Sequence, residues 1–512
     1  MYNLTNYLMS KTSNSRNYFA FLRMWQSGVL LSAAALLMAS CAKDGYDDDE
    51  RFTSSVTGSS LTSPKAESIT VTPSADGKSQ TITWDVVKGA GGYLFSFYDT
   101  GNLNEPIVKD SLVDGCSVTV KREEDVNYRI DLRTAGNPKL NNSEASETTQ
   151  YAFSTFTATF KTIPAGADLN EWFAANPIPD ESIGENLNYD LEAGGQYTIS
   201  GELDFDAHWV TLRSNSKTNP ATIKYTDAAS CINFAAPFNA KYLHFDCSGM
   251  SESIGVFGFS KAPTAERDEA TGFVIFGGNT TIVNCTFDNV NGYFFWDNRK
   301  DQKVAAIQFL IDNCVVALTP PAFVKAGVIW TNKGGHINDL TISNSTFYNL
   351  TEAGDIYYFY QAGMYRAKDI GMGGVGTDQG GPGNSLTYKN CTFYRIGYLN
   401  NEGEWGNYNG MNGKADSYWT MTNCIFYSCS CKGGVPRRFL HGKTYSAESG
   451  NVTFANNTYM QVDGSFDSVG NYDTSGTQIE EDPQFANPAA GDFHISGATQ
   501  IARKTGDPRW LP

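Results

Sequence analysis

The clearest pattern of apolar and polar positions lies in the C-terminal half of the chain, where one short motif recurs. Each copy has a run of alternating apolar and polar residues, an Asn, a small residue and a second short apolar run. This pattern indicates two β-strands joined by a tight turn. The Asn positions of the six copies are 29 to 46 residues apart and are Asn284, Asn313, Asn344, Asn390, Asn423 and Asn456. A unit that recurs at this interval predicts a solenoid of stacked coils.

The Asn of each copy predicts how neighbouring coils are joined. Asn tolerates the left-handed backbone that a one-residue turn requires. Stacked coils lie about 4.8 Å apart, so the six amides can bond to one another as a single buried ladder. The tripeptide that begins at Asn344 also matches a glycosylation acceptor, but the repeat favours the ladder.

Cysteine follows the Asn in most copies, and a degenerate seventh copy covers residues 243–247. One Cys in each coil predicts a column of small apolar side chains in the core. Oxidation that pairs neighbouring coils is the alternative. The cysteines of this column are Cys247, Cys285, Cys314, Cys391 and Cys424. The five His residues show no spacing typical of a metal site.

Residues 66–155 carry a different pattern, namely short strands with a period of two. Such strands at short intervals predict a β-sandwich. The positions of Trp84 and Tyr128 resemble those of a fibronectin type III domain, which implies a spacer.

The N-terminus resembles a lipoprotein export signal. Residues 28–38 form an apolar run that is too short to span a bilayer, and Cys41 follows two small residues. We therefore expect residues 1–40 to be removed and Cys41 to be lipidated; a plain secretory signal with a chance Cys is the alternative. Residues 41–65 are first acidic and then rich in Ser and Thr, as a tether would be. The acidic part resembles the export signal of Bacteroidota lipoproteins, which implies an outer-membrane anchor facing the cell exterior.

Composition narrows the possible partners. The chain has 13% aromatic residues, 49 Gly and a net charge of −17. Removal of residues 1–40 takes away three cations, so the mature chain has a charge near −20. Such an acidic protein is a poor nucleic-acid binder, and we expect no nucleic-acid partner.

Residues 165–512 together resemble a known architecture. A short helix is predicted at 168–175, a Gly-Gly strand entry follows at 189–199, and the chain closes with distinctive segments at 481–488 and 506–510. With the Asn repeat, these features resemble the pectin-lyase-like, right-handed, single-stranded parallel β-helix lipoproteins of Bacteroidota polysaccharide-utilisation loci. The expected fold class is therefore all-β, a β-sandwich followed by this β-helix. The resemblance implies a polysaccharide ligand and an outer-membrane glycan transporter as a partner.

In that fold, the strand that precedes each ladder strand lines the glycan-binding face. Residues 294–299 align with residues 328–333, so Trp296 is expected to stack on Trp330. Cations that recur about once in each coil would match the carboxylates of an acidic, pectin-like chain. Alternatively, both Trp side chains belong to the core and the cations are solvated. The expected binding residues are Trp296, Arg299, Trp330, Lys333, Tyr358, Tyr360, Trp405, Lys414, His441 and Lys443.

Binding without cleavage is the first functional hypothesis, and a polysaccharide lyase is the second. A lyase of this fold needs a basic side chain, here Arg299 or Lys333, and often Ca²⁺ held by carboxylates, here Asp297 and Asp301. These carboxylates do not form a recognisable calcium set, so binding ranks first. A structural or adhesive surface protein is the third class.

Overall fold

The structure is a computed structural model that describes residues 56–74, 79–297, 303–331, 334–362, 384–399, 402–408, 417–440, 451–466 and 472–512. The chain divides into two compact units, a smaller one in the N-terminal part and a larger one that contains residues 153–512. Within the described ranges, no helix is both long and apolar enough to cross a membrane.

The smaller unit is built on antiparallel sheets of three and four strands. Ile82 and Phe95 are fully buried, and the ring of Trp84 stacks on Phe95 at 6.1 Å. This confirms the expected β-sandwich. The first sheet holds β1 (Thr70–Pro73), β2 (Ser79–Thr83) and β5 (Ser117–Lys121), and the second holds β4 (Val108–Val113), β3 (Tyr93–Asp99), β6 (Asn127–Thr134) and β7 (Thr149–Ser154).

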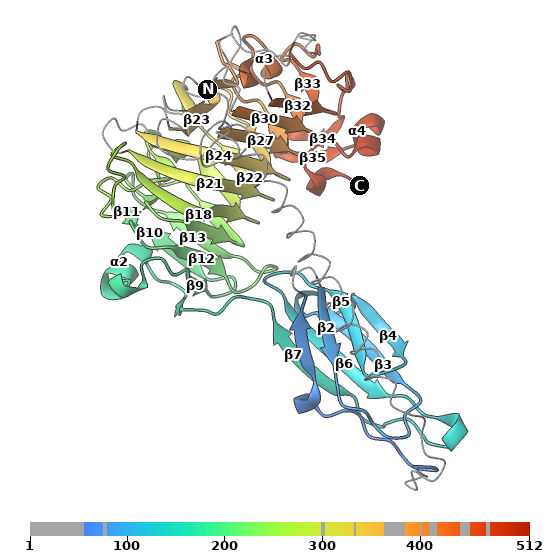
Figure 1. Ribbon diagram of the computed structural model, residues 1–512. Coiled ribbons are helices and arrows are strands. Elements are labelled where there is room, and N and C mark those ends of the chain that lie inside the picture. The colour runs from blue at the N-terminus through green and yellow to red at the C-terminus, as the bar shows by residue number, and fades with distance from the viewer. Residues whose placement is uncertain are drawn as a thin grey trace, which may run out of the picture. The chain divides into compact units, whose positions relative to one another are not determined.

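The larger unit is a parallel β-helix of three sheets, in which each of seven successive coils, from β9 to β29, contributes one strand to each sheet in turn (Figure 1). The ten-stranded sheet holds β8 (Lys161–Ile163), β9 (Leu187–Leu191), β12 (Val210–Ser214), β15 (Phe238–Lys241), β18 (Val274–Val283), β21 (Val304–Asp312), β24 (Gly335–Ser343), β27 (Asn384–Lys389), β30 (Ser417–Thr422) and β32 (Asn451–Ala455). The nine-stranded sheet holds β10 (Gln196–Ile199), β13 (Ala221–Tyr225), β16 (Leu243–Asp246), β19 (Thr286–Val290), β22 (Val315–Leu318), β25 (Thr346–Asn349), β28 (Thr392–Tyr394), β31 (Ile425–Tyr427) and β33 (Thr458–Met460).

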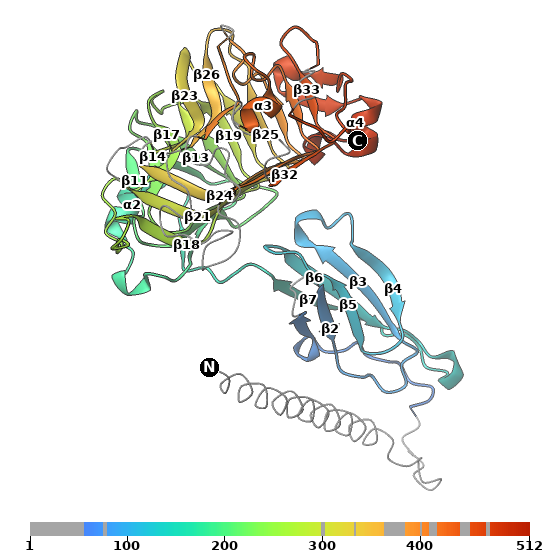
Figure 2. The ribbon, with the colours of Figure 1, turned by 45° about the horizontal axis from the view of Figure 1, so that its top comes forward.

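The seven-stranded sheet follows the nine-stranded sheet along each coil, and Figure 2 shows its strands on a separate side of the β-helix from β18, β21 and β24. It holds β11 (Glu202–Asp204), β14 (Cys231–Phe234), β17 (Gly255–Phe259), β20 (Tyr293–Trp296), β23 (Phe323–Trp330), β26 (Asp355–Ala362) and β29 (Gly406–Tyr408). The expected fold class is thereby confirmed.

The helices are short and lie at the ends of the β-helix or between its strands. At the N-terminal end, the side chain of Asp168 accepts a hydrogen bond from the backbone of Glu171 and caps α2 (Leu169–Ala175), as the sequence predicts. The buried Phe173 of α2 packs on Phe205 at 5.0 Å. The remaining elements are α3 (Val435–Phe439), α4 (Ala498–Arg503), the hairpin β34 (Phe485–Asn487) and β35 (Asp492–Ile495), and the 3-10 turns Ala66–Ser68, Thr100–Asn102, Pro138–Leu140, Asp180–Ser182, Pro488–Ala490 and Pro508–Trp510.

The six ladder Asn residues all have a left-handed backbone, with φ between 48° and 55°. They form the turn from the ten-stranded to the nine-stranded sheet. The amide of each later Asn donates to the carbonyl of the preceding one at four of the five steps, with distances of 2.5 to 3.2 Å. The predicted ladder is confirmed at these steps.

The step from Asn313 to Asn344 is different. Asn344 donates to the Asp312 carboxylate at 2.7 Å, and the Asn313 carbonyl accepts instead from Arg509 at 2.6 Å. Arg509 also pairs with Asp507, whose carboxylate accepts from the hydroxyl of Thr346 at 2.8 Å. The C-terminal segment that the sequence singles out thus fills the gap in the ladder.

Two details of the predicted repeat were wrong. The ladder was expected to be buried, but Asn284 and Asn313 are exposed and the other four are half-buried, because the turn lies at the outer edge of the coil. In the degenerate copy, Phe245 pairs with Phe287, so Tyr242 occupies the ladder turn with a φ of 56°. Cys247 consequently lies at the end of β16, outside the Cys column.

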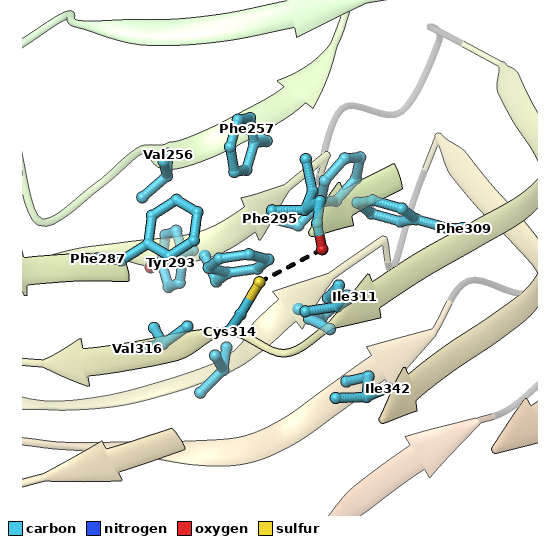
Figure 3. Close-up of a cluster of buried hydrophobic side chains, with 14 of the residues drawn as sticks. Val256, Phe257, Phe287, Tyr293, Phe295, Phe309, Ile311, Cys314, Val316 and Ile342 are labelled. Carbon is cyan, nitrogen blue, oxygen red and sulfur yellow. Dashed lines mark hydrogen bonds between the residues drawn. The ribbon is translucent and has the colours of Figure 1, made fainter. Parts of the chain in front are cut away.

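The core confirms the remaining cysteine prediction. Every cysteine that the structure describes is a free thiol, and Cys285, Cys314, Cys391 and Cys424 are buried at equivalent positions of their coils, with Ser345 in the coil between Cys314 and Cys391. Figure 3 shows Cys314 among apolar side chains, with its thiol bonded to a backbone carbonyl, the Ile282 oxygen at 3.3 Å. Burial raises the pKa of the Cys314 thiol to about 12, so this group is a core filler and a poor nucleophile.

Candidate functional site

The outer face of the seven-stranded sheet carries a column of side chains that changes from coil to coil. The strand register pairs Trp296 with Trp330, as the sequence predicts, and Trp330 with Gln361. The column continues through neighbouring pairs and consists of Asp204, Asn233, Gly258, Trp296, Trp330, Gln361 and Asn407. It is polar at both ends and aromatic in the middle.

The sequence left open whether the two Trp side chains line the binding face or belong to the core, and the structure shows an intermediate arrangement. They are half-buried, pack against the core with part of their surface and leave the rest accessible. The ring of Tyr293 meets Trp330 edge-on at 5.4 Å. Further along the sheet, the rings of Tyr357 and Tyr358 are 4.5 Å apart. We call Tyr293, Trp296, Trp330, Tyr357 and Tyr358 the aromatic strip.

Glycine helps to position the strip. A Cβ at Gly255 would lie 2.7 Å from the backbone nitrogen of Trp296 and 2.9 Å from its Cβ. At Gly327, a Cβ would lie 2.9 Å from the backbone nitrogen of Gln361. These two glycines therefore allow the next strand to approach closely, which sets where its outward side chain stands.

A shallow cavity of about 180 Å³ lies at the end of the strip beside Trp296. Its lining includes Asn233, Gly255 and Lys261. The Glu202 carboxylate accepts from the amide of Asn233 at 2.5 Å and forms an ion pair with Lys261. The cavity thus combines one indole wall with a hydrogen-bonded polar wall.

The described cations beside the strip are already engaged with carboxylates. Lys261 pairs with Glu202, Lys325 pairs with Glu402 at 2.8 Å, and the guanidinium of Arg438 lies 2.5 Å from Glu404. Burial, followed by the nearby Glu404 charge, raises the pKa of Tyr357 to about 12, so this hydroxyl is neutral at physiological pH. In the described part of this face, aromatic surface therefore dominates over free positive charge.

The structure separates the predicted aromatic residues into two groups. Trp296, Trp330 and Tyr358 lie in the strip. Trp405 and Tyr360 lie in the core, where Trp405 is fully buried and stacks on Phe359 at 4.7 Å. We therefore assign Trp405 and Tyr360 to packing, because an enclosed ring has no face to offer a sugar.

A buried carboxylate binds the backbone of residues 397–399. Asp355 is 1% exposed and accepts backbone hydrogen bonds from Gly397, Tyr398 and Leu399 at 2.6 to 3.1 Å. It thereby fixes the segment that leads to Trp405. Burial raises the pKa of Asp355 to about 6 despite these bonds. In the sequence, the only signal of this residue is an Asp at the start of an aromatic strand, so its buried position is not predicted.

The predicted charged residues are placed less fully. Asp297 is fully buried at the end of β20, and its carboxylate occupies the space that a Cβ on Gly335 would need. Among the described residues, no group of three or more His, Cys, Asp or Glu side chains could hold a metal ion. The other predicted residues lie outside the described residues, and they are Cys41, Arg299, Asp301, Lys333, Lys414, His441 and Lys443.

Comparisons with family models cover most of the chain in three pieces. Residues 15–194 match a domain of unknown function, DUF4992, residues 195–350 match DUF4957, also a domain of unknown function, and residues 386–510 match a third, DUF5123. No curated protein matches the chain.

Two pectate lyases are among the similar solved structures. Pectate lyase Pel3 from Pectobacterium carotovorum is 13% identical, with a TM-score of 0.20, over 75% of this chain and 98% of that chain. Pectate lyase PelI from Erwinia chrysanthemi, in complex with tetragalacturonic acid, is 10% identical, with a TM-score of 0.15, over 68% of this chain and 88% of that chain. The β-helix is assigned from the strand pairing alone, and neither likeness bears on fold or activity.

Proposed function

We propose that this protein binds a polysaccharide along the aromatic strip. The observation that carries the proposal is the in-register pair of half-exposed rings, Trp296 and Trp330, on an outer sheet face. Aromatic rings with one apolar face in water offer sugar rings a flat stacking surface, while their own rigidity limits the entropy lost on binding. Tyr358 extends that surface by one coil, next to the amide of Asn407.

We further propose that the glycan is acidic and pectin-like. Because the described cations of this face are paired with carboxylates, this preference rests on Arg299, Lys333, Lys414 and Lys443. In the sequence they follow β20, β23, β29 and α3, about once in each coil. Charge-assisted hydrogen bonds from such cations to uronate carboxylates would add to the stacking.

Affinity gels test both parts. The mature protein is run through homogalacturonan, rhamnogalacturonan, alginate and neutral glycans. We expect retardation by an acidic glycan, about tenfold weaker binding for Trp330→Ala, and no change for Phe160→Ala, which removes an exposed ring outside the seven-stranded sheet. The double variant Arg299→Ala and Lys333→Ala should lose the acidic preference.

The same samples distinguish the alternatives. Growth of ultraviolet absorbance that needs Ca²⁺ and disappears in Lys333→Ala or Arg299→Ala would assign a lyase instead, with Asp297 or Asp301 as calcium ligands. Failure to bind any glycan would favour a structural or adhesive surface protein. Binding to neutral glycans alone would remove the acidic preference.

We also propose that lipidated Cys41 anchors the protein to the outer membrane, facing the cell exterior, where an outer-membrane glycan transporter would be its partner. The acidic residues after Cys41 support this orientation. Membrane fractionation of cells that express Cys41→Ala should find the protein in the soluble fraction. A variant that still sediments with membranes would contradict the anchor.

A further inference from the structure

A second column of interest lies on the ten-stranded sheet, on a different side of the β-helix from the aromatic strip (Figure 2). The strand register pairs Asn279 with Gln308, Gln308 with Asp339, and Asp339 with Ser385. One amide, a second amide, a carboxyl and a hydroxyl thus stand on successive coils, about 4.8 Å apart. The next pair, Ser385 with Tyr418, adds a half-buried aromatic ring.

The column borders a surface cavity of about 400 Å³. Its walls and floor come from Asn279, Gln308, Phe309, Leu310, Asp339, Thr341 and Ser385. The hydroxyl of Thr341 and the side chain of Leu310 belong to the parallel column two residues further along the strands. The lining therefore combines amide and carboxyl groups with apolar and hydroxyl groups, as is typical of sites for small polar ligands.

Several polar groups at this cavity could make further hydrogen bonds. Asn279 and Gln308 are exposed, and within the described residues neither side chain makes a hydrogen bond. The Oδ1 atom of Asp339 is buried and, among the described residues, has no hydrogen-bond partner. Burial raises the pKa of this carboxyl above its usual value. Because the Oδ1 atom of Asp339 is out of reach of a ligand, the two free amides are the groups that a ligand with several hydroxyl groups would satisfy.

The charge of the lining residues indicates which class of ligand the cavity favours. Among the described residues that line it there is no cation, and the one ionisable group there is the carboxyl of Asp339. A uronate chain would meet like charge here without a compensating Lys or Arg. The spacing of one hydrogen-bonding side chain per coil is close to the length of one sugar residue. The observations therefore favour an uncharged glycan over an acidic one.

We propose that the face formed by Asn279, Gln308 and Asp339 binds a neutral glycan segment, separately from the aromatic strip. The amides donate to and accept from sugar hydroxyls, and Leu310 contacts an apolar sugar edge. A protein with both sites would hold two chemically different parts of a branched polysaccharide, or two chains at once.

The test uses the mature protein and neutral probes, namely galactan, xylan and dextran, in affinity gels and isothermal titration. We expect one of these glycans to bind, and the double variant Asn279→Ala and Gln308→Ala to bind it about tenfold more weakly. Gln196→Ala, which removes an exposed amide from the nine-stranded sheet, is the matched control and should bind normally. Both amides are at the surface, so circular dichroism should show an intact fold.

Further variants separate this proposal from the proposed function. Trp330→Ala should leave neutral binding unchanged, and the double amide variant should leave acidic binding unchanged. Neutral binding that is lost in Trp330→Ala, or kept in the double amide variant, would overturn the second site. So would a failure of all three neutral probes to bind. If the mature protein binds a neutral glycan but no acidic one, the acidic preference of the strip is wrong and the second site still stands.

Discussion

The ladder turn and the column on the outer face of the seven-stranded sheet both have one position per coil, yet they use that geometry in opposite ways. The ladder repeats the same residue, Asn, with the same left-handed backbone in every copy. The column on the seven-stranded sheet runs from Asp204 through Trp296 and Trp330 to Asn407 and repeats only its aromatic centre. This solenoid therefore repeats the residue that its backbone requires at the turn, and it varies the side chains on its outer face.

At one step two of the six ladder Asn residues do not bond to each other, and this exception fits the same rule. Where Asn344 turns to Asp312, the chain supplies Arg509 from its C-terminal segment to bond Asn313. An unsatisfied carbonyl at this turn would weaken the stacking of two coils. Arg509 therefore has a structural role at the turn that leads into the nine-stranded sheet, and it is not part of the aromatic strip.

The largest expected effect concerns the ladder backbone. Asn390→Val removes the bonds to Asn344 and Asn423 and places a β-branched residue at a φ of 54°, so we expect it to lower the free energy of unfolding by about 3–4 kcal/mol. Asn390→Gly keeps the turn and should cost about 1–2 kcal/mol. Urea denaturation measures both. Equal losses in the two variants would show that the left-handed turn contributes nothing.

The next effect is a pH dependence of stability, which distinguishes the ladder from the interior behind the aromatic strip. Amides do not titrate, but Asp355 behind the strip has a pKa of about 6, above its value in the unfolded chain. The folded state therefore holds the proton more tightly, and its contribution to stability falls as the pH rises from about 4 to about 6, by roughly 1–3 kcal/mol. Denaturation across this range should show a slope that Asp355→Asn lacks and Asn390→Gly retains. An unchanged slope in Asp355→Asn would assign the titration to other groups.

A smaller effect is expected where the C-terminal segment replaces the ladder bond. A double-mutant cycle of Arg509→Ala and Asn313→Ala should give a coupling of about 1 kcal/mol, since the guanidinium donates to both the side chain and the backbone carbonyl of Asn313. The same cycle with Asn284 in place of Asn313 should give almost none. Similar coupling in both cycles would mean that Arg509 acts through general charge.

The smallest stability change should occur in the strip, where the effect on binding is expected to be largest. Trp330→Tyr keeps an aromatic ring at a half-exposed position, so we expect the free energy of unfolding to change by less than about 1 kcal/mol. Retardation by the acidic glycan should nevertheless weaken about threefold, because the stacking area shrinks. A large loss of stability with unchanged binding would assign Trp330 a packing role, and would contradict the proposal that the ladder serves stability and the strip serves binding.

The sequence by itself determined the parts of this protein that repeat. The period, the left-handed Asn turns, the Cys column and the Asp168 cap depend on local backbone preferences and on spacing along the chain, and the structure has them. The pairing of Trp296 with Trp330 followed from the same alignment of coils. The sequence also identified the C-terminal segment as distinctive, without showing that Arg509 completes the ladder.

Only the tertiary structure decided which side chains face outwards. Trp405 and Tyr360 have the same aromatic character as Trp330 and Tyr358, but Trp405 and Tyr360 are buried whereas Trp330 and Tyr358 are half-buried. Asn279, Gln308 and Asp339 each lie five residues before a ladder Asn, so their pairing follows from the repeat, but only the structure shows that they line a cavity on the outer face. Burial depends on contacts between residues far apart in the chain, so it lies beyond what local periodicity can determine.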